Sequence, residues 1–507
     1  MQENKEKLVY LINGILLLIL PFVAILVYLE DISQAFRMPF ENPDNTGWFI
    51  GTIVVAVICV ILGAFSIQFA KWVNKNRPRP QAIKVLALVF CPIFVLATVG
   101  GTVYFAIEIV EPDRGPYLSW NSDPTTTMTI TWERKEAVDS ILSYYAANGD
   151  QTPIEVEVEP GPLREFDLYY HYTVTLTGLE PDTKYYYEID NFRDPAWFKT
   201  APDSIYADFS FIAYGDSREP SKNFNNQHIP LVQRMLEMVD LEEVGFVIST
   251  GDTTRTHDYI RGWNLHFLAI QDLASRVPYM VAGGNHEWDR SDEISRDWSQ
   301  QPARLIQEFP HTDTLSGAVA SFNNLSYAFG YAGVYMIQIE YPDQWYYEAD
   351  YLDWLNEQLE IGNSTYQFTI VSFHNPPFDH RESGYNDDVQ IIQNLCPLFH
   401  HGGVDMVING HNHNIQRHQI RLGEDLSNRN ITYVISGGGG ANLREPMHGI
   451  WANNYSAGFY GETVMRENTN GYHVARVNGQ DGIMEITAYN LNNEIIDEFT
   501  LESFKNL

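Results

Sequence analysis

Five apolar stretches between residues 209 and 413 have the length of a β-strand, and each ends in residues with metal-binding or acid–base side chains. Helical apolar spacing follows two of them, at 229–239 and 259–276. Strands that alternate with helices predict a layered α/β fold, and polar residues at the carboxyl ends of the strands predict a site at that edge. The polar segments are 215–216 (Gly-Asp), 251–252 (Gly-Asp), 284–287 (Gly-Asn-His-Glu), 374 (His) and 410–413 (Gly-His-Asn-His).

These segments contain a donor set for two divalent cations. Oxygen and imidazole donors suit Zn, Fe, Mn and Co. Two such ions, about 3.5–4 Å apart, can activate a water molecule and clamp a phosphoryl group. A single Gly-Asp is also an ordinary turn, and a single His374 is more often structural, so the ordered combination carries the prediction. The donors are the carboxylates of Asp216 and Asp252, the amide oxygen of Asn285 and the imidazoles of His374, His411 and His413.

Three long apolar stretches without charged residues occupy most of the first 110 residues, at 8–29, 48–70 and 85–107. Each reaches the roughly 20 residues that a helix needs to cross a bilayer, so we predict three transmembrane helices. A cleaved signal peptide would explain only the first stretch. Lys and Arg are concentrated between the second and third stretches. This bias places that loop and the N-terminus in the cytoplasm, and everything after about residue 110 outside it, in a multi-pass cell-membrane protein.

The part of the chain after residue 110 is strongly acidic. Residues 1–110 hold eight Lys and Arg and seven Asp and Glu, so 24 of the 32 basic and 58 of the 65 acidic residues follow them. This surplus of negative charge argues against nucleic acid binding through a basic surface. Cys396 is the only cysteine after residue 110, so no disulfide framework is expected there.

Residues 111–203 have an all-β pattern. Alternation typical of half-buried strands occurs at 128–132 and 171–176, and a Leu-Glu-Pro turn at 179–181 leads into an aromatic strand. The run resembles a fibronectin type III β-sandwich, which usually carries a tryptophan in an early strand, here Trp132. In such a sandwich, Tyr185 or its neighbour would be the tyrosine whose hydroxyl bonds back across a corner.

The stretch from about 209 to 413 resembles the calcineurin-like metallophosphoesterase family, whose pattern is Asp, Gly-Asp, Gly-Asn-His-Asp/Glu, His and Gly-His-X-His. With the sandwich in front, the chain resembles the purple acid phosphatase branch of that family. We therefore expect a multi-domain protein: a membrane region with three transmembrane helices (1–110), a fibronectin III-like β-sandwich (111–203) and an α/β metallophosphoesterase domain built as a layered β-sandwich flanked by helices (204–507).

The resemblance implies a role for each donor. Asp252 would bridge two metal ions, Asp216 and His413 would bind the first, and Asn285, His374 and His411 would bind the second. His286 would stabilise or protonate the departing oxygen, with Glu287 as an orienting partner. Two cations lower the pKa of a water between them, so a bridging hydroxide is expected to attack phosphorus opposite the leaving group.

Two positions depart from the family pattern. Many members have a histidine two places after the first aspartate, where this chain has Arg218, and the purple branch has a tyrosine three places after the bridging aspartate, where this chain has Arg255. Without that tyrosine we expect a non-purple enzyme with two Mn, Zn or Fe ions. Both arginines either bind phosphate oxygens or form structural ion pairs. His380 lies where the purple branch often places a substrate-contacting histidine.

The predicted function is hydrolysis of phosphate monoesters by a membrane-anchored, externally facing, acid phosphatase-like enzyme. A phosphodiesterase or pyrophosphatase with the same site is the alternative within this class. A cell-surface binding or adhesion module with a vestigial metal site is the alternative of another class, and the complete ligand set argues against it. The apolar stretches carry few polar side chains, which argues against a transporter, while their small residues allow packing into a homo-oligomer.

Overall fold

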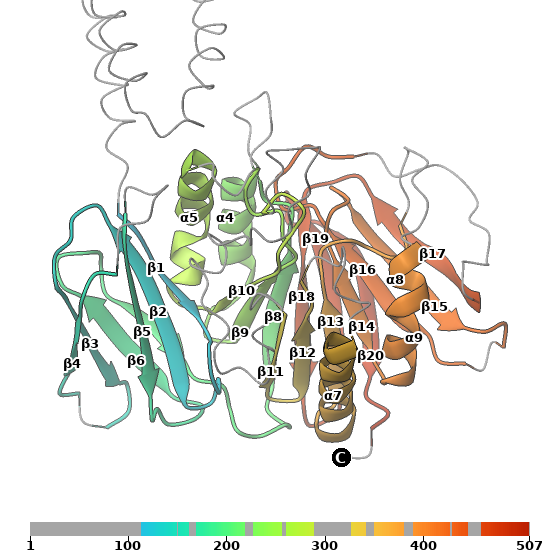
Figure 1. Cartoon of the computed structure of the whole chain (residues 1–507), viewed down its shortest axis with the longest axis horizontal. Helices are drawn as coiled ribbons and strands as arrows, with labels where there is room; N and C mark the ends of the chain where they lie inside the picture. The colour runs from blue at the N-terminus through green and yellow to red at the C-terminus, as the bar shows by residue number, and fades with distance from the viewer. Residues whose placement is uncertain are drawn as a thin grey trace, which may run out of the picture. The chain divides into compact units, whose positions relative to one another are not determined.

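The computed structural model describes most of the chain from Asp113 onward, and Asp113–Leu507 form one compact unit (Figure 1). The described ranges are 113–149, 151–161, 169–218, 227–255, 260–287, 326–340, 349–379, 389–425, 428–444 and 458–505. The three predicted transmembrane stretches, 8–29, 48–70 and 85–107, lie outside them. Among the described residues, no helix combines the length and the apolar character that crossing a bilayer requires.

Two antiparallel sheets form an N-terminal β-sandwich, as the alternating apolar pattern predicts. The three-stranded sheet has the order β1-β2-β5 and the four-stranded sheet the order β4-β3-β6-β7. Their bounds are β1 Arg114–Ser119, β2 Thr127–Arg134, β3 Ser140–Ala146, β4 Ile154–Val158, β5 Tyr170–Thr177, β6 Lys184–Ile189 and β7 Ala196–Lys199.

Aromatic side chains fill the space between the two sheets of the sandwich. Trp132 is fully buried and stacks on Tyr172, with ring centroids 5.3 Å apart. The backbone N–H of Glu180 donates a hydrogen bond to the hydroxyl of Tyr185 at 2.9 Å, five residues upstream of the tyrosine. The predicted corner-closing role of Tyr185 is therefore confirmed.

Two further sheets face each other in the larger, C-terminal part of the unit. One has six strands in the order β10-β9-β8-β18-β19-β20, and the other has seven in the order β11-β12-β13-β14-β16-β15-β17. Strands β8, β9 and β10 run parallel, as do β12, β13, β14 and β16. The bounds are β8 Phe209–Tyr214, β9 Val244–Ser249, β10 Tyr279–Val281, β11 Tyr327–Tyr331, β12 Val334–Gln338, β13 Phe368–Ser372, β14 Met406–Asn409, β15 Ile415–Leu422, β16 Ile431–Ser436, β17 Phe459–Glu467, β18 Gly471–Asn478, β19 Ile483–Asn490 and β20 Ile495–Glu502.

Helices cover the outer face of each large sheet (Figure 1). Helices α4 (His228–Met238) and α5 (Ile260–Ala274) bury residues such as Leu231 and Phe267 against the six-stranded sheet. Helices α7 (Ala349–Thr365), α8 (Val389–Asn394) and α9 (Cys396–His401) cover the seven-stranded sheet. Parallel strands covered on both faces need apolar side chains throughout, and β8, β9 and β13 are buried at every position.

The sandwich packs directly on the two-sheet part. Trp120, which follows β1, is fully buried, and its ring centroid lies 5.5 Å from that of Phe329 and 6.4 Å from that of Phe246. One continuous apolar cluster therefore runs from the sandwich into the space between the two large sheets. Burial of this aromatic surface stabilises the arrangement of the two parts.

Two predictions about elements need correction. The sequence pattern predicts one helix over 389–399, but the structure divides it into α8 and α9, because Pro397 in the first turn of α9 has no backbone N–H with which to continue the hydrogen bonding of α8. The pattern also predicts a closing hairpin at 472–477 and 483–490, which exists as β18 and β19, but β20 follows and pairs with β19 as the edge of the sheet.

Candidate metal centre

Loops that follow strands of both large sheets meet at one edge of the two-sheet part. Asp216 follows β8, Asp252 follows β9 and Asn285 follows β10 in the six-stranded sheet. In the seven-stranded sheet, His374 follows β13, and His411 and His413 follow β14. All five strands present their carboxyl ends here, so the strand-end positions that the sequence singles out converge in space, as a site in an α/β layer requires.

Close backbone approach is what allows the loops to converge. A Cβ atom on Gly437 would lie 2.0 Å from the backbone oxygen of Asn412 and 2.9 Å from Oδ2 of Asp216. A Cβ atom on Gly284 would lie 2.3 Å from the backbone nitrogen of Asp252. The glycine run at 437–440 therefore serves close packing after β16, which is the function that its position after a strand predicts.

Three of the six predicted donors adopt a backbone conformation that is rare for residues other than glycine. Asp216, Asp252 and His411 have φ angles of 58°, 54° and 66°. This left-handed region costs about 1–2 kcal/mol for a residue with a Cβ atom. It turns each side chain inward directly after its strand, and such strain is typical of functional sites.

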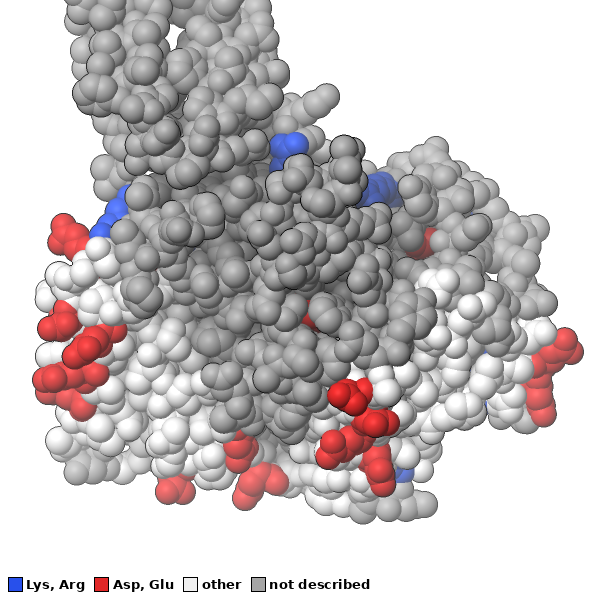
Figure 2. All heavy atoms as spheres, in the orientation of Figure 1, with Lys and Arg blue, Asp and Glu red and all other residues white. Residues whose placement is uncertain are grey.

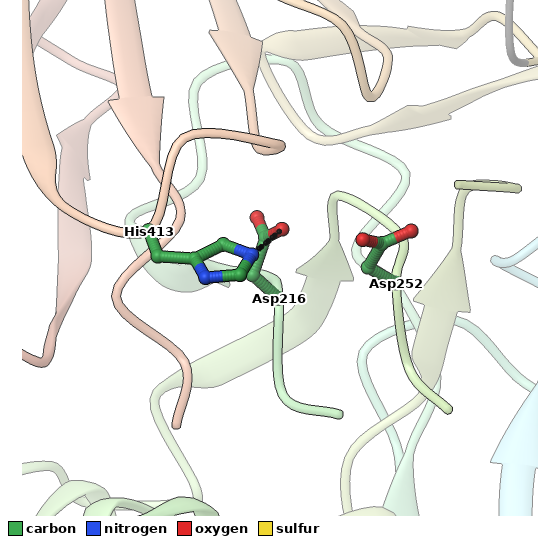
Figure 3. A group of neighbouring side chains, drawn as sticks. All are labelled: Asp216, Asp252 and His413. Carbon is green, nitrogen blue, oxygen red and sulfur yellow. Dashed lines mark ion pairs between the residues drawn. The ribbon is translucent and has the colours of Figure 1, made fainter. Parts of the chain in front are cut away.

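The first group of donors consists of Asp216, Asp252 and His413 (Figure 3). Each offers one ligand atom, and the three atoms lie within 4.8 Å of one another. Nε2 of His413 lies 3.3 Å from Oδ1 of Asp216. That Oδ1 atom is buried and accepts no hydrogen bond from a described residue, although the Oδ2 atom accepts one from the backbone of His411 at 2.7 Å. A buried carboxylate oxygen without a hydrogen bond is a suitable ligand for a cation.

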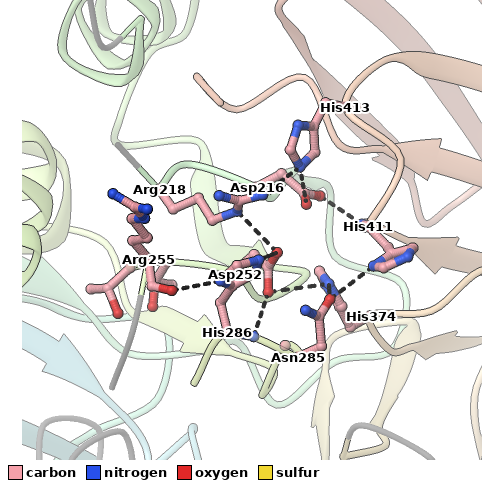
Figure 4. Close-up of polar contacts among 12 residues, drawn as sticks. Asp216, Arg218, Asp252, Arg255, Asn285, His286, His374, His411 and His413 are labelled. Atoms are coloured by element: carbon pink, nitrogen blue, oxygen red, sulfur yellow. Dashed lines mark hydrogen bonds and ion pairs between the residues drawn. The ribbon is translucent and has the colours of Figure 1, made fainter. Parts of the chain in front are cut away.

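The second group consists of Asn285, His374 and His411, with Asp252 between the groups (Figure 4). Oδ1 of Asn285 lies 3.2 Å from Nε2 of His374 and 2.9 Å from Nδ1 of His411. Nε2 of His374 is also 3.3 Å from Oδ1 of Asp252. Two oxygen and two nitrogen donors are thus gathered on the side of Asp252 opposite His413.

Two of the histidines are held with one ring nitrogen available for the cluster. Nδ1 of His374 lies 2.8 Å from the backbone oxygen of Thr250, and Nδ1 of His413 hydrogen-bonds the backbone oxygen of Asn442. A carbonyl can only accept, so both Nδ1 atoms carry a proton, and both Nε2 atoms are left facing the carboxylates. Metal-binding histidines are oriented by the same arrangement, and the donor set fits a pair of divalent cations.

Comparison with known proteins identifies the two parts of the unit. Residues 211–414 match the calcineurin-like phosphoesterase family. Residues 114–201 match the purple acid phosphatase N-terminal domain, so the sandwich has a counterpart in the same group of proteins. A purple acid phosphatase from yellow lupin (Lupinus luteus) seeds has a related fold, with a TM-score of 0.63, 16% identity and coverage of 77% of this chain and 74% of that chain.

Curated relatives of the chain include plant purple acid phosphatases. Purple acid phosphatase 21 of Arabidopsis thaliana is 25% identical over 271 residues, which cover 53% of this chain and 57% of that protein. Probable purple acid phosphatase 20 of the same plant is 23% identical over 353 residues, covering 66% of this chain and 73% of that protein. The chain thus spans little more than half the length of the first of these relatives.

The structure brings together all six predicted metal ligands of the calcineurin-like phosphoesterase domain. Their individual roles as ligands stay predictions. The charges of the group are consistent with cation binding: burial alone would raise the pKa of Asp252, but His374, His286 and Arg218 hold it well below its usual range. Burial would lower the pKa of His374, yet Asp252 and Asp216 raise it to about 9. The cluster therefore attracts positive charge.

Glu287 binds the backbone of two loops that meet at the cluster, the loop of Asp252 and the loop of Gly284. Its buried carboxylate accepts hydrogen bonds from the backbone N–H groups of Asp252, Thr253, Thr254 and Gly284 at 2.9, 2.7, 3.2 and 2.7 Å, and from the hydroxyl of Thr253 at 2.8 Å. Burial and the charge of Asp252 raise the pKa of Glu287, and these donors oppose the rise. Glu287, which was expected to orient a neighbour, therefore orients the loop of Asp252 and Gly284.

His286 is placed at the rim of the cluster. Its backbone N–H donates to Oδ1 of Asp252 at 3.0 Å, and Nε2 of its ring lies 3.8 Å from Oδ2 of the same residue. The ring is 19% exposed, so it faces both the carboxylate and the solvent. This position is compatible with the predicted contact to a departing oxygen, which stays a prediction.

The three predicted substrate-binding residues have different positions. Arg218 reaches into the cluster, with Nε 3.2 Å from Oδ2 of Asp252. Arg255 lies at the rim, where its side chain is exposed and its backbone oxygen accepts a hydrogen bond from His286. His380 lies outside the described residues. Arg218 thus forms the carboxylate ion pair that was one of its two predicted alternatives.

Arg444 is a residue near the cluster that the sequence did not single out. It follows the glycine run after β16, and its Nη1 atom donates to the backbone oxygen of His411 at 3.3 Å. Its backbone N–H donates to the backbone oxygen of His413 at 3.1 Å. In the sequence, Arg444 is distinguished only by its position four residues after Gly440. That signal is weak, because loops of this kind have no fixed residue pattern.

Proposed function

We propose that the chain is a membrane-anchored phosphoesterase that hydrolyses phosphate monoesters outside the cytoplasm. The observation that carries this proposal is the convergence of two carboxylates, one amide and three imidazoles on one buried cluster, with Oδ1 of Asp216 left without a hydrogen bond. The similarity to purple acid phosphatases supports monoesters as the substrate class. The three apolar stretches and the basic loop support membrane anchoring.

Each of these residues would have a role set by its position in the cluster. Asp216 and His413 would hold one cation, Asn285, His374 and His411 a second, and Asp252 would contact both. Bound cations would lower the pKa of a water molecule and neutralise charge on the phosphoryl group. Glu287 would hold the loop of Asp252, and His286, partly exposed at the rim, would donate a proton to the leaving oxygen.

The test uses the full-length chain purified in detergent and stripped of metal. Mn, Zn or Fe(II) would be restored separately, and hydrolysis of an aryl phosphate monoester and the matching diester would be measured. We expect metal-dependent turnover with a preference for the monoester. Asp252→Asn should abolish turnover, whereas Asp203→Asn, a change of the same kind at an exposed position between β7 and β8, should leave it unchanged.

Other results would favour the alternatives. A preference for the diester, or for pyrophosphate added as a third substrate, would replace the monoesterase by one of the related activities. A folded protein that binds metal but is inactive on all three substrates would favour a surface-binding module with a vestigial centre.

A further inference from the structure

Arg218 contacts two of the three donors of the first group. Its Nε atom lies 3.2 Å from Oδ2 of Asp252, and its Nη2 atom lies 3.5 Å from Nε2 of His413. The arginine side chain is 13% exposed and the Asp252 side chain 2%, so this contact is largely shielded from solvent. Figure 4 shows the guanidinium pointing at the carboxylate of Asp252, close to Asp216 and His413.

The two oxygens of Asp252 face different neighbours. Oδ1 lies 3.3 Å from Nε2 of His374, on the side of the second group. Oδ2 faces Arg218, on the side of His413. The guanidinium therefore lies against the Asp252 oxygen on the side of the first group.

We infer that Arg218 acts as an internal cation that competes with a metal ion for the first group of donors. A guanidinium is always protonated in proteins, so its charge cannot be removed by deprotonation to admit the ion. Two positive charges within a few ångströms of each other in a poorly solvated site repel strongly. The group Asn285, His374, His411 and Asp252 would therefore fill first, and the group Asp216, Asp252 and His413 would fill only when Arg218 moves away from Asp252.

This inference rests on the proposed function for the existence of the metal centre, but its test does not need turnover. The full-length chain in detergent, stripped of metal, would be titrated with Mn²⁺ by calorimetry, and Mn²⁺ electron paramagnetic resonance would be recorded at one and two equivalents. The unmodified chain should bind one ion tightly and a second much more weakly. Its spectrum at two equivalents should be that of isolated bound and free ions.

Arg218→Ala should tighten the second step by on the order of tenfold or more, because it removes a charge in direct contact with a ligand atom. At two equivalents this variant should give the spectrum of a coupled ion pair. Arg218→Lys keeps the positive charge and should keep the weak second step. Arg234→Ala removes a charge of the same kind from an exposed position on α4, where Arg234 pairs with Glu237, and should bind Mn²⁺ as the unmodified chain does.

Two equal tight steps in the unmodified chain, or an unchanged second step in Arg218→Ala, would overturn the inference while leaving the phosphoesterase proposal in place. Failure of a folded chain to bind Mn²⁺, Zn²⁺ or Fe²⁺ at any step would overturn the metal centre and the inference together. Unequal loading that Arg218→Ala abolishes, in a protein without hydrolytic activity, would support the inference and contradict the proposed function.

Discussion

A single residue near this centre can fix the position of a loop and of the predicted ligand on it, and Glu287 is the clearest case. One carboxylate accepts five hydrogen bonds from the loop of Asp252 and from Gly284. All five partners are donors, so an acceptor-only carboxylate is the side chain that satisfies them. The position of Asp252 therefore depends on a residue that contacts no expected metal ion.

Glu287→Gln should destabilise the protein and weaken metal binding. The amide NH₂ group would face backbone donors in place of an acceptor, and the loss of charged hydrogen bonds would lower the free energy of unfolding by about 2–3 kcal/mol. Thermal unfolding of the full-length chain, with Mn²⁺ affinity measured in parallel, checks this. Glu243→Gln, at an exposed position before β9, is the matched control. Equal unfolding temperatures for both variants would contradict the structural role of Glu287.

At the scale of elements, one buried ion pair links the first strands of the sandwich to helix α5. Nη1 of Arg114 on β1 lies 2.7 Å from Oε2 of Glu133 on β2, and both side chains are nearly inaccessible. Nε of the same arginine donates to Oδ1 of Asn264 on α5 at 2.6 Å. Nε2 of His171 on β5 is paired with the other oxygen of Glu133. The guanidinium of Arg114 and the carboxylate of Glu133 thus connect strands β1, β2 and β5 and helix α5.

Arg114→Met should lower the free energy of unfolding by about 3 kcal/mol or more, because it leaves a carboxylate buried with one partner removed. Hydrogen exchange should also increase in β1 and in α5. Lys199→Met breaks the exposed pair of Lys199 with Asp182, whose side chains are 39% and 60% exposed, and should cost less than about 1 kcal/mol. Similar losses of unfolding free energy in both variants would contradict the expectation that the buried Arg114–Glu133 pair contributes more to stability than an exposed pair.

Elements with strong apolar patterns were predictable from the sequence. The parallel strands β8, β9 and β13 are buried at every position, so their apolar runs are continuous and short. Strands β15, β17 and β20 were not predicted. Their burial alternates irregularly and they carry many polar residues, as in Gln416, Arg417 and Gln419 of β15, so no continuous apolar run marks them in the sequence.

The sequence marks the six positions that the structure brings together, but not the residues that surround them. The six donors are marked by their residue types at strand ends, which is a local property of the sequence. The contact of Arg218 with His413 joins residues 195 positions apart, and the contacts of Arg444 arise in a loop. Such contacts depend on how two sheets face each other, and no local pattern specifies that.

At the scale of the whole molecule, the distribution of charge follows the predicted division of the chain. Described Asp and Glu side chains spread over the sandwich and along the lower rim of the face in Figure 2. The part after residue 110 carries 58 acidic against 24 basic residues, as counted in the sequence. An anionic substrate would therefore be attracted by cations bound at the centre and not by the field of the whole protein.

The orientation in the membrane gives a prediction at this scale. An epitope tag after Leu507 should bind antibody on intact cells without permeabilisation, because the basic loop between the second and third apolar stretches is expected to stay in the cytoplasm. Replacing the basic residues of that loop by glutamine should reduce surface labelling. The loop residues to change are Lys71, Lys75, Arg77 and Arg79. Labelling only after permeabilisation would place the phosphoesterase domain in the cytoplasm.

The left-handed backbone at Asp216, Asp252 and His411 also bears on the history of the chain. Glycine adopts this conformation without a steric penalty, so mutation to glycine at each of these positions would relax the main chain. A lineage that no longer needed a metal centre would gain by such changes and would lose the ligands one after another. This chain has two aspartates and a histidine at these positions, so glycine at any one of them should relax the main chain and at the same time remove a predicted ligand.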